Sequence, residues 1–288
     1  MRPSSVTVST RRSGPRKSLG QHFLADSRIA ARIVDAAELE SADTVVEIGP
    51  GRGFLTRRLV ERAGRVIAIE LDARLCAELP SRLGFPDNLD CVLADAREAD
   101  LPALSRSVQG LSDSGYKVVG NLPYYAANPI IRRTLESRPP PSRALFMVQK
   151  EVADSMTAPP GSMSLLSVAT QYYAEARTVC SVPPNAFRPP PKVRSAVVRL
   201  DLRERPAVDT PDAQAFFDVV RAGFSAPRKQ LHNSLGHGLG IEPRLAATLL
   251  EQASIDGRRR PATLSLQEWA SVCAAWQDTK PEMIYRAD

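Results

Sequence analysis

Short apolar runs rich in β-branched residues alternate with amphipathic stretches along the first two hundred residues. Such runs predict strands, and the β-branched run at residues 44–48 predicts one that is fully buried in its sheet. The predicted strands are 44–48, 65–69, 89–93, 116–120 and 143–149. Apolar residues spaced three and four apart predict helices between and after them. The predicted helices are 28–38, 54–63, 72–83, 129–136, 150–158 and 164–173. This alternation predicts an α/β fold with a parallel, doubly wound, Rossmann-like sheet.

The pattern changes after residue 173. Residues 174–182 and 193–200 predict two strands, and their short connection makes them an antiparallel pair at the sheet edge. The proline-rich connection between them predicts a stiff, extended loop. A polar segment, 203–211, predicts a linker. Only helical patterns follow, at 212–223, 229–235, 243–252 and 265–276, and Ser265-Leu-Gln-Glu268 predicts a capping box at the start of the last helix.

Three parts are therefore expected. Residues 1–16 form a basic tail, which is expected to be disordered, although a basic arm that contacts phosphates is the alternative. Residues 17–203 form the α/β domain, and residues 204–288 form a small, all-helical C-terminal domain.

Composition narrows the class of protein. The chain has 288 residues, a net charge of +6 and a pI of about 9.3, which fits a polyanionic partner. The four cysteines form no CxxC pair and the three histidines have no ligand spacing, so we expect reduced thiols, no metal site and a cytoplasmic protein. No apolar run reaches the length of a membrane span, and the N-terminus lacks the apolar core of a secretory signal.

A glycine turn follows the first predicted strand. The sequence GPGRG (residues 49–53) joins this strand to a helix, which is the arrangement of a nucleotide-binding corner. The next strand ends at Glu70, whose carboxylate could accept from both hydroxyls of a ribose. A dinucleotide fingerprint requires a third glycine where Phe54 stands. The pattern therefore favours S-adenosylmethionine. The third strand closes at Asp95, which suits a cofactor's adenine amine, or alternatively caps a helix.

A second motif follows the fourth strand. Pro123 stops that strand and presents Asn121 at its carboxyl end, where open α/β sheets bind ligands. The Asn121 amide offers one acceptor and two donors, and Tyr124 supplies a flat face. Acceptors beside an aromatic platform can grip the exocyclic amine of a nucleobase. A strand followed by a tight turn with surface tyrosines is the alternative.

Two further features remain open from the residues alone. Phe187 lies on the proline-rich loop and could form the second wall for a flipped base, or fill the core under the loop. The basic clusters 228–229 and 258–260 could contact phosphates or form solvated faces.

From residue 17 to about residue 276 the chain resembles the ribosomal RNA adenine N6,N6-dimethyltransferase family. The motifs that carry the resemblance are SLGQHFL (18–24), VVEIGPGRGFLT (45–56), IAIELD (67–72), NLPYY (121–125) and FRPPPKVRSAV (187–197). FSAPRKQLHNSL (224–235) resembles the small-subunit enzymes in particular. The chain departs from the family at His22, where Asn is usual, and at Pro227, where a basic residue is common.

The resemblance implies an S-adenosylmethionine-dependent enzyme. Its cofactor residues would be His22, Leu24, Gly49, Gly51, Glu70, Asp95 and Asn121. Its catalytic group would be Asn121, Leu122, Pro123, Tyr124 and Phe187. The implied substrate is a pair of adjacent adenosines in the 3′-terminal hairpin of small-subunit (16S) rRNA, presented on an immature 30S subunit. The helical domain would contact rRNA or the ribosome, and a monomer without metal is expected.

Three rival functions differ in class. A related enzyme would methylate 23S rRNA and confer macrolide resistance, but the segment 224–235 argues against it. A DNA adenine methyltransferase would typically carry Asn-Pro-Pro-Tyr or its acidic version, and Leu122 interrupts that motif. A non-catalytic monitor of subunit assembly would not need the intact glycine turn with Glu70 and Asp95.

Overall fold

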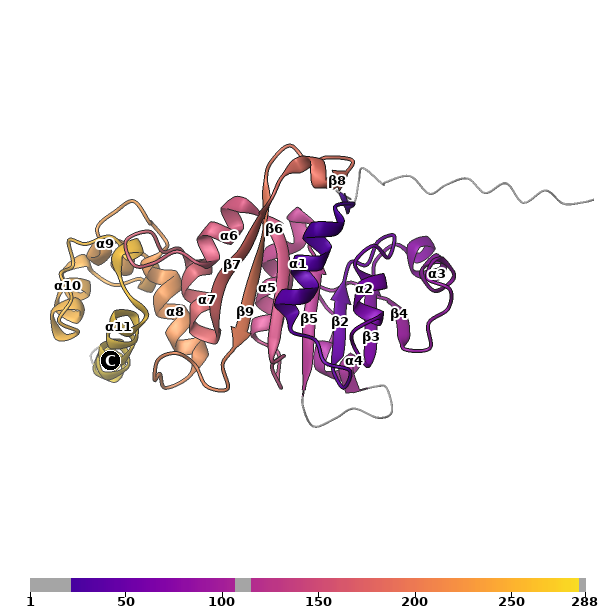
Figure 1. The fold of residues 1–288 in the computed structure, drawn as a ribbon. Helices are drawn as coiled ribbons and strands as arrows, with labels where there is room; N and C mark the ends of the chain where they lie inside the picture. Colours follow the sequence, from indigo (N-terminus) through magenta and orange to yellow (C-terminus); the bar gives the residue numbers. More distant parts are fainter. Residues whose placement is uncertain (1–21, 107–114, 285–288) are drawn as a thin grey trace, which may run out of the picture.

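The computed structural model describes residues 22–106 and 115–284. The tail predicted at residues 1–16 lies outside these ranges, as does the start of the lead-in motif. Within the described part, a seven-stranded sheet with helices on both faces is followed by a separate group of helices (Figure 1).

The sheet has the strand order β4-β3-β2-β5-β6-β9-β7. Its strands are β2 (Thr44–Ile48), β3 (Arg65–Glu70), β4 (Leu89–Leu93), β5 (Tyr116–Asn121), β6 (Arg143–Gln149), β7 (Ala174–Val182) and β9 (Ser195–Leu202). The first five strands in this order are parallel, as predicted, and β9 runs antiparallel to both β6 and β7. The predicted antiparallel pair at the sheet edge is therefore confirmed.

Burial explains why β9 lies inside the sheet and β7 at its edge. Six successive residues of β9 are buried, whereas only Ala174, Cys180 and Val182 of β7 are buried. A strand that is apolar on both faces needs a neighbour on each side and cover above and below.

Two apolar cores cover the two faces of the sheet, which confirms the doubly wound arrangement. One core holds α1 (Ser27–Ala37), α2 (Thr56–Val60) and α3 (Ala73–Arg82) against the sheet. The other holds α4 (Leu101–Arg106), α5 (Ala127–Leu135), α6 (Lys150–Met156) and α7 (Leu165–Tyr173). Successive side chains of β2 enter different cores, Val45 the first and Val46 the second.

Some local predictions were wrong. The helix expected at 54–63 is only α2, because turns occupy the residues before it. The helix α4 was not predicted. The proline-rich loop is not wholly extended, since it contains a 3₁₀ turn, η3 (Pro184–Ala186), and a two-residue strand.

That strand, β8 (Phe187–Arg188), pairs with β1 (Phe23–Leu24) in a second, antiparallel sheet. Phe23 lies opposite Arg188 and Leu24 opposite Phe187. The Ala25 amide N–H extends the pairing by donating to the Ala186 carbonyl at 2.8 Å. The lead-in segment is thereby joined to the proline-rich loop, at the upper edge of the sheet in Figure 1.

The C-terminal group is all helical, as predicted. Its elements are α8 (Ala213–Gly223), α9 (Leu231–Leu239), α10 (Pro243–Gln252), η4 (Pro261–Thr263) and α11 (Leu266–Ile284). The predicted capping box before α11 is present, because the Glu268 amide N–H donates to Ser265 Oγ and the Ser265 amide N–H to Glu268 Oε2. The group packs on α7, where the rings of Tyr172 and Phe216 stack with centroids 4.7 Å apart.

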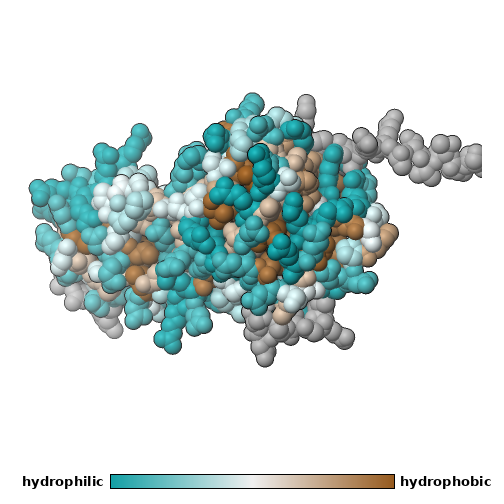
Figure 2. Space-filling view, in the orientation of Figure 1, coloured by the Kyte–Doolittle hydropathy of each residue, from teal (hydrophilic) through white to brown (hydrophobic). Residues whose placement is uncertain are grey.

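The outer surface is largely hydrophilic in the view of Figure 2, with small apolar patches between the polar side chains. In the described ranges, every helix falls short of the length and apolar character that a membrane crossing requires. The same ranges contain no cluster of three or more His, Cys, Asp or Glu side chains arranged to hold a metal ion.

Candidate active site

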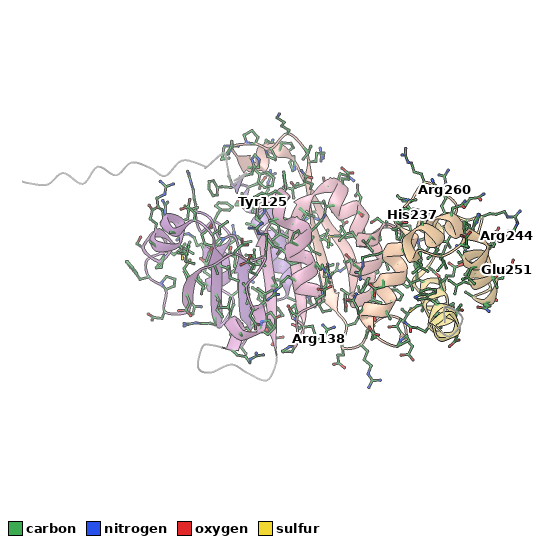
Figure 3. All side chains as sticks on the ribbon, turned by 180° about the vertical axis from the view of Figure 1, so that it is seen from behind. Tyr125, Arg138, His237, Arg244, Glu251 and Arg260 are labelled. Carbon is green, nitrogen blue, oxygen red and sulfur yellow. The ribbon has the colours of Figure 1, made fainter. Side chains whose placement is uncertain are left out.

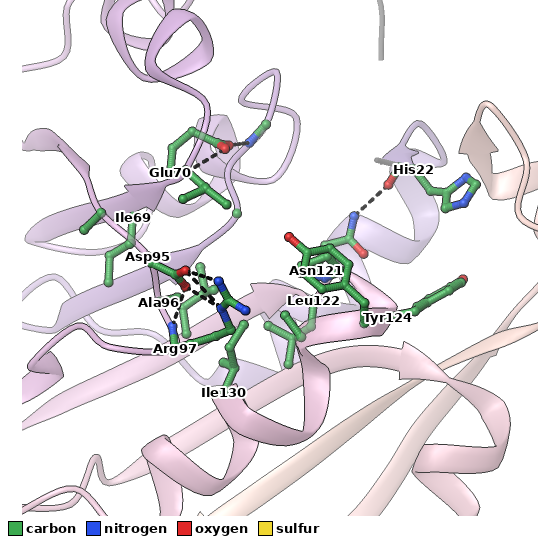
Figure 4. A pocket seen from close by; sticks show the side chains of 18 of the residues that line it. His22, Ile69, Glu70, Asp95, Ala96, Arg97, Asn121, Leu122, Tyr124 and Ile130 are labelled. Atoms are coloured by element: carbon green, nitrogen blue, oxygen red, sulfur yellow. Dashed lines mark hydrogen bonds and ion pairs between the residues drawn. The ribbon is translucent and has the colours of Figure 1, made fainter. Parts of the chain in front are cut away.

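An open cavity lies at the carboxyl ends of the parallel strands (Figure 4). From β2 the chain winds to β3 and β4 on one side of the sheet, and later to β5 and β6 on the other. The cavity therefore sits where the winding direction changes, which is where open α/β sheets bind their ligands.

The glycine turn after β2 forms one wall. Gly49, Gly51 and Gly53 have φ angles of +71°, +56° and +80°, a region that side chains disfavour. At Gly51 the space is also filled, because an added Cβ would lie 2.9 Å from the ring of Phe23. The Arg52 guanidinium lies over the same ring, 4.9 Å from its centroid. The turn and the lead-in segment are thus in close contact at the cavity.

Replacing Gly51 with alanine is therefore expected to weaken cofactor binding. Both Gly51 and Gly84 have positive φ, but an added Cβ at Gly84 meets open space. Gly84→Ala is the matched control, since it carries the backbone cost of roughly 1 kcal/mol without the collision. In a calorimetric titration with S-adenosylhomocysteine, Gly51→Ala should raise Kd by about tenfold or more and Gly84→Ala should leave it unchanged. Equal affinities in the two variants would contradict this account of the turn.

Glu70 holds the glycine turn to the end of β3. Its Oε2 accepts the Gly51 amide N–H at 3.1 Å, and its Oε1 accepts the amides of Leu71 and Asp72 at 2.9 Å each. Burial raises the pKa of Glu70, although the three N–H donors oppose this. A carboxylate has about four acceptor directions, so about one is left for a ligand.

Asp95 follows β4 and lines the same cavity. Its Oδ1 accepts the Arg97 amide N–H at 2.9 Å, the local bond that a helix-capping aspartate makes. The Arg97 guanidinium also bonds to both carboxylate oxygens and lowers the pKa of Asp95. A turn at residues 96–98 follows Asp95 and α4 begins only at Leu101, so the helix-cap alternative is wrong, and contact of Asp95 with a ligand stays a prediction.

Asn121 ends β5 on the opposite side of the cavity. Its Nδ2 donates to the His22 carbonyl at 3.0 Å, which fixes the amide and leaves Oδ1 as an acceptor (Figure 4). The His22 ring forms a hydrogen bond of 2.8 Å between Nδ1 and the Pro189 carbonyl. His22 therefore bridges the Asn121 motif and the proline-rich loop. At this position, where the family usually has Asn, both the backbone carbonyl and the imidazole ring of the histidine form hydrogen bonds.

Tyr124 is half-buried beside Asn121. Its hydroxyl lies 2.8 Å from Ser195 Oγ, and its ring lies 5.8 Å from the His22 ring, at an angle of 30°. Burial raises the pKa of Tyr124. The neighbouring Tyr125 is 54% exposed. Two fixed contacts therefore hold Tyr124 in place, while Tyr125 remains accessible at the cavity edge.

Phe187 and Leu24 have different relations to the cavity. Phe187 is only 1% exposed and belongs to the core beneath the loop, which is one of the two alternatives from the sequence. It also lines the cavity, and its role as a wall for a flipped base stays a prediction. Leu24 is paired with Phe187 but does not line the cavity, because its side chain packs into the same core. Any contact from Leu24 to a cofactor would have to come from its backbone.

The family model for ribosomal RNA adenine dimethylase matches residues 12–273. The chain belongs to this family. It is a member of a group of S-adenosylmethionine-dependent methyltransferases. The cavity fits that cofactor: the glycine turn would close if a side chain were added at Gly51, and carboxylates at Glu70 and Asp95 stand at successive strand ends.

Relatives with the same printed name cover nearly the whole chain. "Ribosomal RNA small subunit methyltransferase A" of Moorella thermoacetica is 45% identical over 91% of this chain and 93% of its own length. The protein of that name from Pelotomaculum thermopropionicum is 44% identical, over 96% and 97%.

Two solved structures are also similar to this family member. The 23S rRNA methyltransferase ErmE has a TM-score of 0.69 and 30% identity, over 88% of this chain and 99% of its own. A dimethyladenosine transferase from Plasmodium falciparum has a TM-score of 0.75 and 25% identity, over 90% and 98%.

Sequence reasoning missed several residues at the cavity or beside it. Phe23 and Arg97 line it, and Ser195 orients Tyr124. The buried Glu47 lies in β2, two residues before the first glycine of the turn. A signal for Glu47 was available, since a carboxyl group inside an apolar strand is unusual. The others depend on contacts between distant segments or on side-chain direction, which the local pattern does not contain.

Burial raises the pKa of Glu47 to about 8, and the nearby Glu70 carboxyl adds to the shift. Its Oε2 lacks a hydrogen-bond partner in the described part of the chain. In the unfolded chain the Glu47 carboxyl loses its proton near pH 4.5, the ordinary pKa of a glutamate. In the folded protein it keeps the proton up to about pH 8. The folded state therefore loses stability as pH rises through this window, by at most about 5 kcal/mol.

Glu47→Gln removes this titration, so the variant should gain stability relative to the wild type as pH rises. Urea unfolding at pH 5 and at pH 8.5 measures the difference in the free energy of unfolding. Between pH 5 and pH 8.5 the free energy of unfolding of the variant should rise relative to that of the wild type by on the order of several kcal/mol. If the difference in the free energy of unfolding between the variant and the wild type is the same at both pH values, Glu47 does not hold its proton in the folded state.

Proposed function

We propose that this enzyme transfers methyl groups from S-adenosylmethionine to N6 of two adjacent adenosines in the 3′-terminal hairpin of small-subunit rRNA, and dimethylates each. One observation carries the proposal: a single cavity joins the glycine turn to the Asn121–Tyr124 motif. The relatives named for the small subunit, at 45% and 44% identity, support this substrate over the 23S rRNA of the 30% identical ErmE.

The cofactor half of the cavity comprises the turn and the two strand-end carboxylates. We assign Gly49 and Gly51 to the close approach of the backbone, Glu70 to the ribose and Asp95 to the adenine amine. His22 and Asn121 would close the side that faces the base. The sulfonium of S-adenosylmethionine supplies an electrophilic methyl group, so the acceptor amine needs positioning rather than a metal.

The base half comprises the NLPYY motif and Phe187. A target adenine must leave its stack, which costs a few kcal/mol. Tyr124 would stack on the base, and Phe187 would bound the other side. Asn121 Oδ1 and the Leu122 carbonyl are the acceptors for the amine hydrogens, and Pro123 sets the turn that directs them. In the described residues no donor meets the Leu122 carbonyl.

Positioning would then supply most of the acceleration, since a well-oriented pair of reacting groups reaches effective molarities of about 10⁵ M or more. The methylated amine is cationic and can release its proton to water, so no side chain is assigned as a general base. A monomethylated amine must enter the same cavity for the second transfer.

The helical domain, assigned to residues 204–288, is proposed to contact rRNA. Figure 3 labels His237 and Arg260 on the edge of this domain that lies on the same side of the molecule as Tyr125 at the cavity, whereas Arg138 lies on the opposite side. Arg260 and other arginines on the cavity side would bind the phosphates around a target hairpin. We further propose that the enzyme acts in the cytoplasm, as a monomer, on rRNA within an immature 30S subunit.

A methylation map tests the proposal. Purified enzyme is incubated with labelled S-adenosylmethionine and either naked 16S rRNA, naked 23S rRNA or undermethylated 30S subunits, and the products are mapped by nuclease digestion. Dimethyladenosine at two adjacent positions of the 16S 3′ hairpin, formed on 30S subunits, is expected. If label appeared only in 23S rRNA, the proposal would be wrong and the enzyme would be a 23S rRNA methyltransferase of the macrolide-resistance type. Cofactor binding without transfer to any of the three RNAs would favour a non-catalytic role.

A further inference from the structure

The chain repeats a local pair of the form Asp-X-Arg at residues 26–28, 72–74, 95–97 and 256–258. In each, the arginine amide N–H donates to the aspartate two residues earlier, and the guanidinium lies beside the same carboxylate. Such a pair is a common local arrangement at turns and helix starts. Its presence at 95–97 therefore indicates nothing by itself.

The pair at 95–97 differs from the other three in its surroundings, because both of its residues line the cavity. Arg97 Nε lies 3.0 Å from each of the two Asp95 oxygens, and Nη2 adds a further bond to Oδ2. With the Arg97 amide N–H on Oδ1, most acceptor directions of Asp95 are occupied by one residue. Figure 4 shows the guanidinium on the cavity side of Asp95.

A ligand amine that binds Asp95 must therefore compete with Arg97. The competition is uneven, because the Arg97 side chain is 45% exposed and exposed ion pairs are weak. An arginine displaced from Asp95 keeps its charge and its planar set of donors. Tyr125 lines the same cavity and is exposed at its edge.

We propose that Arg97 couples cofactor binding to RNA binding: the cofactor's adenine amine takes Asp95, and the released guanidinium binds a phosphate of the target RNA. This inference rests on the proposed function, because it takes Asp95 as the adenine ligand. While Arg97 is paired with Asp95, neither the cofactor nor the RNA can use its own partner at the site. Binding of either ligand therefore favours the state in which Arg97 has left Asp95. The coupling must be reciprocal.

The first test is a calorimetric titration with S-adenosylhomocysteine and no RNA. Arg97→Met removes the competitor but keeps an apolar stem of similar length, and it should lower Kd by about threefold or more. Arg28→Met is the matched control, because its Asp-X-Arg pair with Asp26 does not line the cavity, and its Kd should equal that of the wild type. An unchanged or higher Kd in Arg97→Met would overturn the proposal.

The second test measures coupling with a synthetic RNA hairpin that carries two adjacent adenosines in its loop. In the wild type and in Arg28→Met, saturating hairpin should lower the Kd for S-adenosylhomocysteine, at most to the value of RNA-free Arg97→Met. Saturating S-adenosylhomocysteine should in turn steepen the salt dependence of hairpin binding by up to one phosphate contact. In Arg97→Met both effects should vanish.

The two proposals fail in different ways. If the wild type does not bind S-adenosylhomocysteine at all, the proposed function itself is wrong. If it binds and methylates but Arg97→Met shows the same coupling as the wild type, only the role of Arg97 is rejected. Absence of any hairpin binding by the wild type at low salt also rejects that role, because the released cation would then have no RNA to bind.

Discussion

Asn121→Ala is expected to reduce methyl transfer by at least about 10²-fold while changing cofactor affinity by no more than about threefold. The substitution removes the Oδ1 acceptor that would hold the amine, and a reacting group misplaced by about 1 Å can lose about 10²-fold in rate. Single-turnover transfer to undermethylated 30S subunits measures the rate, and titration with S-adenosylhomocysteine measures affinity.

Asn121→Asp serves as the paired variant. It keeps an acceptor oxygen but loses the Nδ2 donor that now bonds to the His22 carbonyl at 3.0 Å. We expect activity between that of the alanine variant and the wild type if acceptance of the amine is the main role. If the alanine variant dimethylates at the wild-type rate, the role assigned to Asn121 is wrong. If both variants lose cofactor binding instead, Asn121 serves the cofactor site through His22.

Glu70→Ala is expected to abolish measurable cofactor binding, with Kd raised by about 10²-fold or more. The carboxylate now accepts three backbone N–H groups, including that of Gly51, and its loss leaves them without a partner at the turn. Each unsatisfied buried group costs about 1–3 kcal/mol, so the free energy of unfolding should also fall. Calorimetric titration and urea unfolding measure the two effects.

Two controls separate these effects. Glu70→Gln keeps the volume but has a single acceptor oxygen, so it should retain part of the stability and bind cofactor weakly. Glu175→Ala removes an exposed carboxylate that pairs with Arg203, away from the cavity, and should change neither quantity appreciably. Full cofactor affinity in Glu70→Ala would remove Glu70 from the site.

The sequence alone determined the architecture of the α/β part. Parallel strands in the interior of a sheet are rich in apolar residues, so the local pattern marked β2 and β6 with their correct bounds. The bounds of the partly buried edge strand β4 were also predicted correctly. Glycines with positive φ and a proline after Asn121 are local requirements of the backbone, and they marked both walls of the cavity. The apolar repeat and the Ser265–Glu268 box marked the last helix for the same reason.

Only the tertiary structure decided which segments meet. The pairing of Leu24 with Phe187 and the bridge from His22 to Pro189 join segments far apart in the chain. The placement of Phe187 between core and cavity depends on the same pairing. The pair of Asp95 and Arg97 has the same local form as three other Asp-X-Arg pairs in the chain. Only the packing of the strand ends makes this pair part of a binding cavity. Local pattern sets each element, whereas contacts between elements depend on how all of them pack together.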